Sequence, residues 1–194
     1  MKLLIVGLNY APEPVGIGPY TAGLAEAMAR RGHMVEVIAG KPYYPQWRPY
    51  EGQPPGVTRS HENGVAVTRV PHYIPANPSG ARHIAHYASF AARALVPALA
   101  AAKGADLVFA VAPSLLSVPV ALRAATRAGA PLWLHIQDFE VEAALATMTE
   151  EIRSTSWSVT TKGSKRMGLT STCSVRAWMA APTMARVCIS AISG

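Results

Sequence analysis

Polar and aromatic side chains gather in short segments of this chain that follow runs of apolar residues. The segment 135–140 reads His-Ile-Gln-Asp-Phe-Glu, and a histidine near carboxylates can transfer protons or orient a hydroxyl group. The candidate catalytic residues are therefore His135, Asp138 and Glu140. Gln137 is a candidate substrate-binding residue. The alternative is a hydrogen-bonded core histidine followed by acids that cap the next helix.

A second candidate segment, 41–48, combines aromatic rings with two cations in the sequence Lys-Pro-Tyr-Tyr-Pro-Gln-Trp-Arg. Aromatic rings pack on the faces of sugars, and arginine binds phosphate through two parallel hydrogen bonds, so the segment suits a glycan or a lipid-linked phosphate. The candidate substrate-binding residues are Tyr43, Tyr44, Trp47 and Arg48. The alternative is a loop stiffened by proline that only packs onto a sheet.

A third segment places Gly16, Ile17 and Gly18 directly before a predicted helix. Exposed N–H groups at a helix N-terminus can bind a phosphate, so all three are candidate substrate-binding residues. The alternative is that the glycines only permit a tight turn. Thr21 stands where a dinucleotide fingerprint needs its third glycine, and residues 39–41 lack the ribose-binding acid. Both departures argue against a nicotinamide-dependent oxidoreductase.

Ser114 and two histidines complete the set of candidate side chains. Ser114 follows Ala-Pro after an apolar run and could bind a ligand, although an ordinary helix N-cap is the alternative. His83 and His86 are three residues apart on a predicted helix, but the pattern supplies no third metal ligand. We predict a solvated helix face there and no metal site.

The elements that must position these residues alternate between strand and helix. The apolar patterns predict strands at 3–6, 35–38, 107–111 and 132–136, and helices at 19–31, 81–102 and 114–127. A hairpin is predicted from strands 57–60 and 65–70, because Asn63-Gly64 between them suits a tight reversal. This order predicts an α/β fold with a Rossmann-like, doubly wound parallel sheet, which binds ligands beyond the carboxyl ends of its strands.

Composition limits the class of protein. The chain has 194 residues, half of them apolar and 15% charged, which excludes disorder and fits little more than one domain. A net charge of +7 favours anionic partners, but the basic residues are scattered, so we predict no nucleic-acid partner. Two cysteines without metal spacing indicate a reducing compartment. The uncharged run 107–122 is too short to span a bilayer, so we predict no transmembrane helix and no export signal.

The segment 147–194 differs from the rest of the chain. It is rich in serine and threonine and shows no sustained helical or strand period, apart from a short apolar run at 187–189 that could form a strand. We interpret it as an irregular tail, altered by truncation or by a shifted reading frame. The predicted domain therefore covers residues 1–146.

Several separated motifs together resemble the N-terminal domain of family 4 glycosyltransferases, in particular the colanic-acid and O-antigen exopolysaccharide enzymes. The motifs that carry the resemblance are Leu3 with Ile5-Val6-Gly7-Leu8-Asn9-Tyr10-Ala11-Pro12-Glu13-Pro14, Gly16-Ile17-Gly18, Pro42-Tyr43-Tyr44-Pro45 and Leu134-His135-Ile136-Gln137-Asp138-Phe139-Glu140. They occur in the family's order and cover roughly residues 1–146.

The resemblance implies a GT-B architecture and retaining transfer of a hexose from a nucleotide-sugar, the co-substrate, to a lipid-linked or glycan acceptor. It implies no metal and no resident cofactor. Gly16 and Gly18 would face the donor diphosphate and the acceptor, and Gln137 with Asp138 would lie near the reacting sugar, where many relatives have His-Asp. The family's second, donor-binding lobe has no counterpart in this sequence, so we expect little activity from the chain alone.

A lipid-linked acceptor also implies a cytoplasmic protein that contacts the inner face of the membrane. The alternative function is a non-catalytic, Rossmann-like ligand-binding module.

Overall fold

A single mixed sheet organises the chain. The computed structural model describes residues 1–136 and 187–191, and seven strands pair there in the order β3-β4-β2-β1-β5-β6-β7. Only β3 and β4 are antiparallel. The strands are β1 (Lys2–Gly7), β2 (Met34–Gly40), β3 (Thr58–Glu62), β4 (Val65–Val70), β5 (Leu107–Val111), β6 (Leu132–Ile136) and β7 (Val187–Ala191). The predicted doubly wound α/β fold is confirmed.

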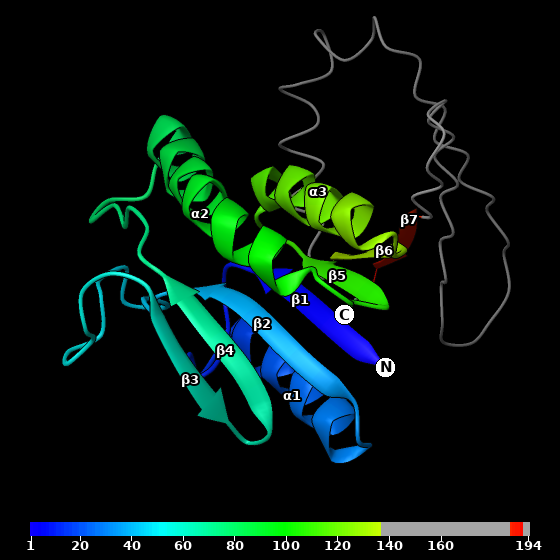
Figure 1. The fold of residues 1–194 in the computed structure, drawn as a ribbon. Helices are drawn as coiled ribbons and strands as arrows, with labels where there is room; N and C mark the ends of the chain where they lie inside the picture. Colours follow the sequence, from blue (N-terminus) through cyan, green and yellow to red (C-terminus); the bar gives the residue numbers. More distant parts are fainter. Residues whose placement is uncertain (137–186, 192–194) are drawn as a thin grey trace, which may run out of the picture.

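Helices cover both faces of this sheet. They are α1 (Ile17–Arg30), α2 (Gly80–Ala101) and α3 (Val118–Ala128), the last preceded by a short 3-10 turn, η1 (Leu115–Ser117). Figure 1 shows α2 and α3 together on one side of the sheet and α1 on the other. The central strand β1 is therefore buried on both faces, which explains its continuous apolar run.

Alternate residues of the central strand build two separate cores. Leu4 and Val6 of β1 pack on the side of α2, together with Phe90. Leu3 and Ile5 point to the opposite side and join the core below α1. This alternation is the two-residue period of a strand, and it fixes the register of β1 because a slip of one residue would exchange the two faces.

The predicted hairpin is formed by β3 and β4. Asn63 and Gly64 at its tip have φ values of 49° and 85°, which matches the left-handed turn that an Asn-Gly pair favours. β4 then pairs in parallel with β2. The hairpin thus adds an antiparallel edge to an otherwise parallel sheet.

Two predictions about helices need correction. Ser114 makes no capping hydrogen bond, because the chain first forms the turn η1 and α3 begins only at Val118, with Pro119 in its first turn. His86 does not lie on a solvated face, because it is fully buried on the same stripe of α2 as Phe90 and Ala94. The spacing 86, 90, 94 is the signal that could have located it in the core.

The chain end is described only in part. The predicted strand at 187–189 is confirmed as β7, which pairs in parallel with β6. The tail interpretation for the rest of 147–194, and the domain boundary at 146, fall outside the described residues and stay predictions.

Helix α2 has an apolar outer surface. Among the described residues, α2 is the one helix that is long and apolar enough to cross a membrane, judged by length and composition alone. In its most apolar window, 28% of the helix is buried within the structure. It packs on α3, η1 and β2.

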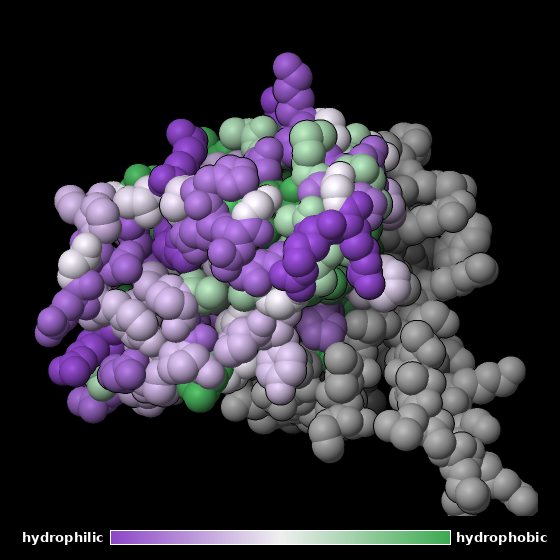
Figure 2. Space-filling view, turned by 90° about the horizontal axis from the view of Figure 1, so that it is seen from below, coloured by the Kyte–Doolittle hydropathy of each residue, from purple (hydrophilic) through white to green (hydrophobic). Residues whose placement is uncertain are grey.

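The uncharged run 107–122 is divided among β5, η1 and α3. A different face, seen in Figure 2, is mostly hydrophilic with small apolar areas.

Candidate functional site

The chain reverses its winding direction at β1. From β1 the sheet grows through β2 and β4 in one direction, and the chain then crosses back to place β5 on the other side of β1. In such sheets the crevice beyond the carboxyl ends of the two central strands is the usual ligand site. Gly7, the last residue of β1, lies tightly against Val111 of β5, where a Cβ on the glycine would come within 3.0 Å. Among the described residues, the loops that leave β1, β2 and β5 and the end of β6 line this edge of the sheet.

The first of these loops ends at the N-terminus of α1. Gly16 is the N-cap residue, with φ 71° and ψ −150°, and no side chain caps the helix. The first turn also carries no acidic residue. Ile17 packs its side chain into the core, so only its backbone N–H can reach a ligand. The uncapped N–H groups and the helix dipole together provide a place for a phosphate.

The loop after β2 carries the predicted aromatic residues, but they differ in exposure. Tyr43 is only 3% exposed and supports the loop from below. Tyr44 and Trp47 are half-buried, and Arg48 is exposed. Tyr43 packs edge-on against Trp47, with ring centroids 5.3 Å apart. We call residues 41–50 the aromatic loop; of its rings, Tyr44 and Trp47 are the ones accessible to a sugar.

The outer part of the aromatic loop encloses a shallow hollow of about 270 Å³. Its lining residues are Gln46, Arg48, Pro49, Tyr50 and Glu51. The Tyr50 hydroxyl donates a hydrogen bond to the Tyr44 carbonyl, 2.8 Å away, which closes the loop on itself. Amide, guanidinium and carboxylate groups around a small hollow suit the hydroxyl groups of a sugar.

Histidines lie beneath the aromatic loop, a feature that the sequence analysis missed. The His86 ring is 4.7 Å from the Tyr43 ring and 5.0 Å from that of His72, between centroids. Burial lowers the pKa of both histidines, and that of His72 falls to about 4. The Nδ1 atoms of His72 and His86 face the carbonyls of Val70 and Tyr73. The two rings are therefore neutral at pH 7 and serve as packing for the loop.

Glu13 connects the two loops and was also not identified as a site residue. Its carboxylate accepts hydrogen bonds from the backbone N–H groups of Tyr43 and Tyr44, at 3.0 and 3.1 Å, and from the Asn9 side-chain amide at 2.9 Å. The side chain is 3% exposed, and burial raises its pKa. Tyr43 and Tyr44 are 30 and 31 residues away in the chain, so no local pattern reveals these two contacts.

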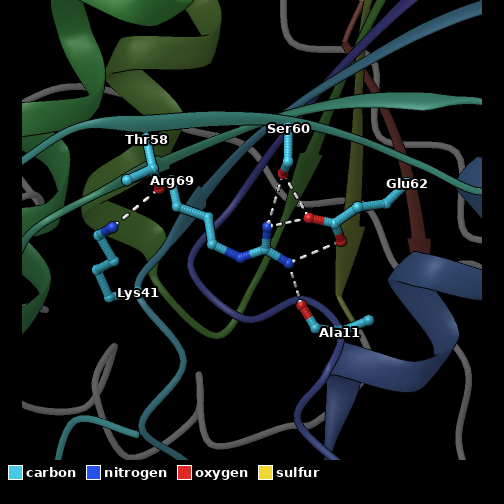
Figure 3. Close-up of polar contacts among 6 residues, drawn as sticks. All are labelled: Ala11, Lys41, Thr58, Ser60, Glu62 and Arg69. Atoms are coloured by element: carbon cyan, nitrogen blue, oxygen red, sulfur yellow. Dashed lines mark hydrogen bonds and ion pairs between the residues drawn. The ribbon is translucent and has the colours of Figure 1, made fainter. Parts of the chain in front are cut away.

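A second polar cluster, around Arg69, also holds the first loop (Figure 3). The Arg69 guanidinium donates to both carboxylate oxygens of Glu62 and, at 2.6 Å, to the Ala11 carbonyl. Ser60 donates to Glu62 and lies 3.3 Å from Arg69. Hydrogen bonds from Arg69 keep the pKa of Glu62 below its usual range. This cluster is a structural support of the loop, because its donors and acceptors satisfy one another.

The other half of the crevice is formed by the ends of β5 and β6. The Ala112 N–H donates to the His135 carbonyl at 2.9 Å, which places Ser114 close to the end of β6. Ser114 is fully buried, and its hydroxyl makes no hydrogen bond among the described residues. The His135 ring stacks on Phe109, and burial lowers the pKa of this histidine.

The structure thus brings the predicted residues together in two groups. Gly16 meets the aromatic loop directly, since a Cβ at this glycine would lie 3.4 Å from the Tyr44 ring. Ser114 and His135 form the second group at the same edge of the sheet, because β1, β2, β5 and β6 run parallel. Gln137, Asp138 and Glu140 lie outside the described residues.

Over residues 1–136, no group of three or more His, Cys, Asp or Glu side chains could hold a metal ion. The arrangement offers instead uncapped N–H groups, ring faces and an exposed guanidinium. Such a set can bind a phosphorylated or glycosylated molecule at the edge of the sheet.

The fold and the site together define a Rossmann-like lobe of the kind found in GT-B glycosyltransferases. The family model for the glycosyl transferase 4-like domain matches residues 15–183. The chain belongs to this family. The match extends past residue 146.

Two relatives illustrate the similarity. The chain is 40% identical over 146 residues to the putative colanic acid biosynthesis glycosyl transferase WcaI of Escherichia coli K12, an alignment that covers 75% of this chain and 36% of that protein. The fold is similar to the catalytic domain of starch synthase IV from Arabidopsis thaliana, solved with ADP and acarbose, with a TM-score of 0.53 and 19% identity. That match covers 72% of this chain and 34% of the other.

Proposed function

We propose that this chain takes part in the transfer of a hexose from a nucleotide-sugar to a lipid-linked or glycan acceptor during exopolysaccharide synthesis, and that it supplies the acceptor-binding lobe. The observation that carries the proposal is the aromatic loop fixed beside the uncapped N-terminus of α1, at the reversal point of the sheet. The similarity to a colanic acid glycosyl transferase supports the same reading.

Each accessible group has a role in this proposal. Tyr44 and Trp47 pack on sugar faces, and Arg48 binds a phosphate of the acceptor. The N–H groups of Gly16, Ile17 and Gly18 face the donor diphosphate. Ser114 is not accessible: it is fully buried beyond the end of β5, its hydroxyl has no hydrogen-bond partner among the described residues, and it stays a proposed substrate ligand.

His135, near the end of β6, and residues that follow it in the sequence supply the proton chemistry. Burial lowers the pKa of His135, so its imidazole is neutral at pH 7 and can accept a proton or orient a hydroxyl. Asp138 and Glu140 remain proposed catalytic partners, and Gln137 a proposed substrate ligand.

The chain spans about a third of the length of the two relatives described above. In GT-B enzymes the donor is held largely by the second lobe, whose positive groups stabilise the leaving diphosphate. We therefore expect binding of the acceptor without efficient turnover from residues 1–194. Rapid transfer from UDP-glucose or GDP-mannose by this chain would contradict that expectation.

Acceptor binding provides the direct test. We expect calorimetric titration with a short-chain prenyl-diphosphate-linked disaccharide to show binding that Trp47→Ala and Arg48→Ala each weaken about tenfold, or about 1.4 kcal/mol. Arg59→Ala is the matched control, because Arg59 is an exposed arginine on the edge strand β3. Equal affinities for wild-type, Trp47→Ala and Arg48→Ala, or no binding to the wild-type chain, would refute the proposal.

A lipid-linked acceptor would bring the protein to the inner face of the membrane, and α2 offers a surface for this contact. Ile84 and Val96 are 63% and 74% exposed, Arg82 and Arg93 are exposed, and α2 contains no acidic residue. Apolar and basic side chains on one helix suit an anionic lipid surface. We expect co-sedimentation with phosphatidylglycerol vesicles, reduced by the Ile84→Ser, Val96→Ser double variant; binding unchanged by that variant would exclude α2.

A further inference from the structure

Glu13 is a buried carboxylate placed between the two loops of the acceptor site. One of its oxygens, Oε1, accepts the N–H groups of both Tyr43 and Tyr44, and Oε2 accepts the Asn9 amide. All of these donors are neutral. The same Asn9 amide also contacts the Tyr43 hydroxyl at 3.3 Å.

Within residues 1–136, no cationic side chain forms an ion pair or hydrogen bond with this carboxylate. Arg69 contributes only a weaker, longer-range attraction, because its guanidinium is bonded to Glu62 and to the Ala11 carbonyl. Burying a carboxylate without a counter-ion costs free energy that several hydrogen bonds only partly offset. An apolar side chain would avoid this cost, but it would leave the N–H groups of Tyr43 and Tyr44 without their acceptor. The carboxylate is therefore retained as the acceptor that joins the aromatic loop to the loop after β1.

The contacts of Glu13 show which parts of the site it joins. A Cβ at Gly18, in the first turn of α1, would lie 3.3 Å from the Glu13 Cβ and 3.4 Å from Oε2. On its other side the carboxylate holds two consecutive backbone N–H groups of the aromatic loop, next to Tyr44, which packs over Gly16. The side chain thus spans from the glycine turn to the aromatic loop.

We propose that Glu13 is a positioning residue that fixes the aromatic loop against the N-terminus of α1, so that Tyr44, Trp47 and Arg48 are held in their acceptor-binding arrangement before the acceptor arrives. Glu13 does not touch the acceptor. The inference rests on the proposed function for its consequence in binding, but the attachment of the loop can be measured without any ligand. Holding a loop in its bound conformation lowers the entropic cost of binding.

The hydrogen-bond polarity of the Asn9–Glu13 pair allows a rescue experiment. In Glu13→Gln the amide oxygen can still accept from Tyr43 and Tyr44, but the amide nitrogen faces the Asn9 amide nitrogen. To avoid two opposed donors, Asn9 must turn its amide over and give up its present contact with the Tyr43 hydroxyl. The double variant Asn9→Asp, Glu13→Gln reverses the donor and the acceptor and restores the contact. It also keeps the net charge of the wild-type chain.

Hydrogen exchange at the Tyr43 and Tyr44 amides is the first readout. We expect Glu13→Gln to accelerate exchange at these two amides at least tenfold, while Val37 and Val108 in the central strands keep their wild-type rates. The double variant should return both tyrosine amides to within threefold of wild-type. Unchanged tyrosine amides in Glu13→Gln, equal acceleration at Val37 and Val108, or a double variant that exchanges like Glu13→Gln would each overturn the proposal. If Glu13→Gln does not fold, a folded double variant with wild-type rates supports it, and an unfolded double variant overturns it.

Binding of the prenyl-diphosphate-linked disaccharide is the second readout. We expect Glu13→Gln to weaken the affinity about tenfold and the double variant to recover it, whereas equal affinities in all three proteins would overturn the link between Glu13 and acceptor binding. If the wild-type chain binds no acceptor, the proposed function fails. The exchange measurement then still decides whether Glu13 holds the loop.

Discussion

Two polar clusters hold the loop that follows β1, and they differ in how their charges are balanced. In the Arg69 cluster the guanidinium pairs with the Glu62 carboxylate and also donates to the Ser60 hydroxyl and the Ala11 carbonyl. In the Glu13 cluster the carboxylate is held by neutral donors only. The pKa of Glu62 is accordingly lowered, whereas burial raises that of Glu13.

This difference in charge distinguishes the Arg69 cluster, which supports the loop, from Glu13, which is proposed to position the two loops of the site. A paired charge stabilises the loop at a point away from the proposed ligands, where nothing further has to bind. The unpaired carboxylate stands between the two loops that are proposed to bind substrate, where its orientation fixes their spacing. Costly polar groups concentrate at functional sites for this reason.

The largest expected effect is on stability, when the Arg69–Glu62 pair that supports the loop is broken. Arg69→Met removes one partner of a mostly buried pair and leaves the Glu62 carboxylate without its cation. Because Glu62 is about one-third exposed, we expect a loss of about 2 kcal/mol in the free energy of unfolding, below the range for fully buried pairs. Urea denaturation measures it. Arg59→Met, on the adjacent strand and exposed, should change stability by less than about 0.5 kcal/mol; equal effects of the two substitutions would contradict the assignment.

The pH dependence of stability should have opposite signs for the two carboxylates. The pKa of Glu62 is lowered in the folded state, so its contribution is present above its usual value of 4.5 and is lost as pH falls below it. The pKa of Glu13 is raised, so the folded state binds this proton first and stability is gained as pH falls from 7 towards 4.5. Each slope is at most about 1.4 kcal/mol per pH unit.

Subtracting the stability of a single variant from that of the wild-type protein at each pH isolates the contribution of one carboxylate. On acidification, wild-type should gain stability relative to Glu13→Gln and lose stability relative to Glu62→Gln. The pKa of His72 is lowered to about 4, so stability also falls between pH 6.5 and 4 because the unfolded chain binds the proton first. This loss occurs in every variant and cancels in the differences. Two differences of the same sign would remove the contrast between the clusters.

A pair of glycines in α1 sharpens the comparison further. Gly23→Ala meets no atom within 4 Å and should stabilise the helix by about 1 kcal/mol. Gly18→Ala has the same helical advantage, but its Cβ would press on Glu13 and on the Tyr10 carbonyl. We expect it to show no net gain in thermal unfolding, together with faster exchange at the Tyr44 amide. If both substitutions stabilise the chain equally, the contact between Gly18 and Glu13 is not tight.

The sequence predicted the sheet well and the site only in part, for physical reasons. Strands such as β1 and helices such as α2 are encoded by local apolar periods, which can be read without knowing the partner element. The glycine turn and the aromatic loop were also predicted, because their residue types concentrate within a few positions. Glu13 and Arg69 were missed because their contacts with Tyr43, Tyr44 and Ala11 join residues far apart in the sequence. For Ser114, the alternative of a helix cap was wrong because η1 precedes α3.

Lys41 is expected to give the smallest change in stability. Its charge is arranged differently from that of Arg69 and from that of Glu13. It is 6% exposed, and its amine donates to the Thr58 hydroxyl at 2.8 Å (Figure 3). Burial, and then the Arg69 cation, lower its pKa. Its charge is thus neither paired, as in Arg69, nor held by several donors or acceptors, as in Glu13.

Lys41→Met should therefore change the free energy of unfolding by less than about 0.5 kcal/mol, because the lost hydrogen bond is offset by relief of burial and of repulsion from Arg69. Urea denaturation beside Arg69→Met checks this order. A loss for Lys41→Met as large as that for Arg69→Met would mean that a single hydroxyl partner stabilises a buried cation as well as a carboxylate does. The distinction between paired and unpaired charges would then not explain why the two clusters differ.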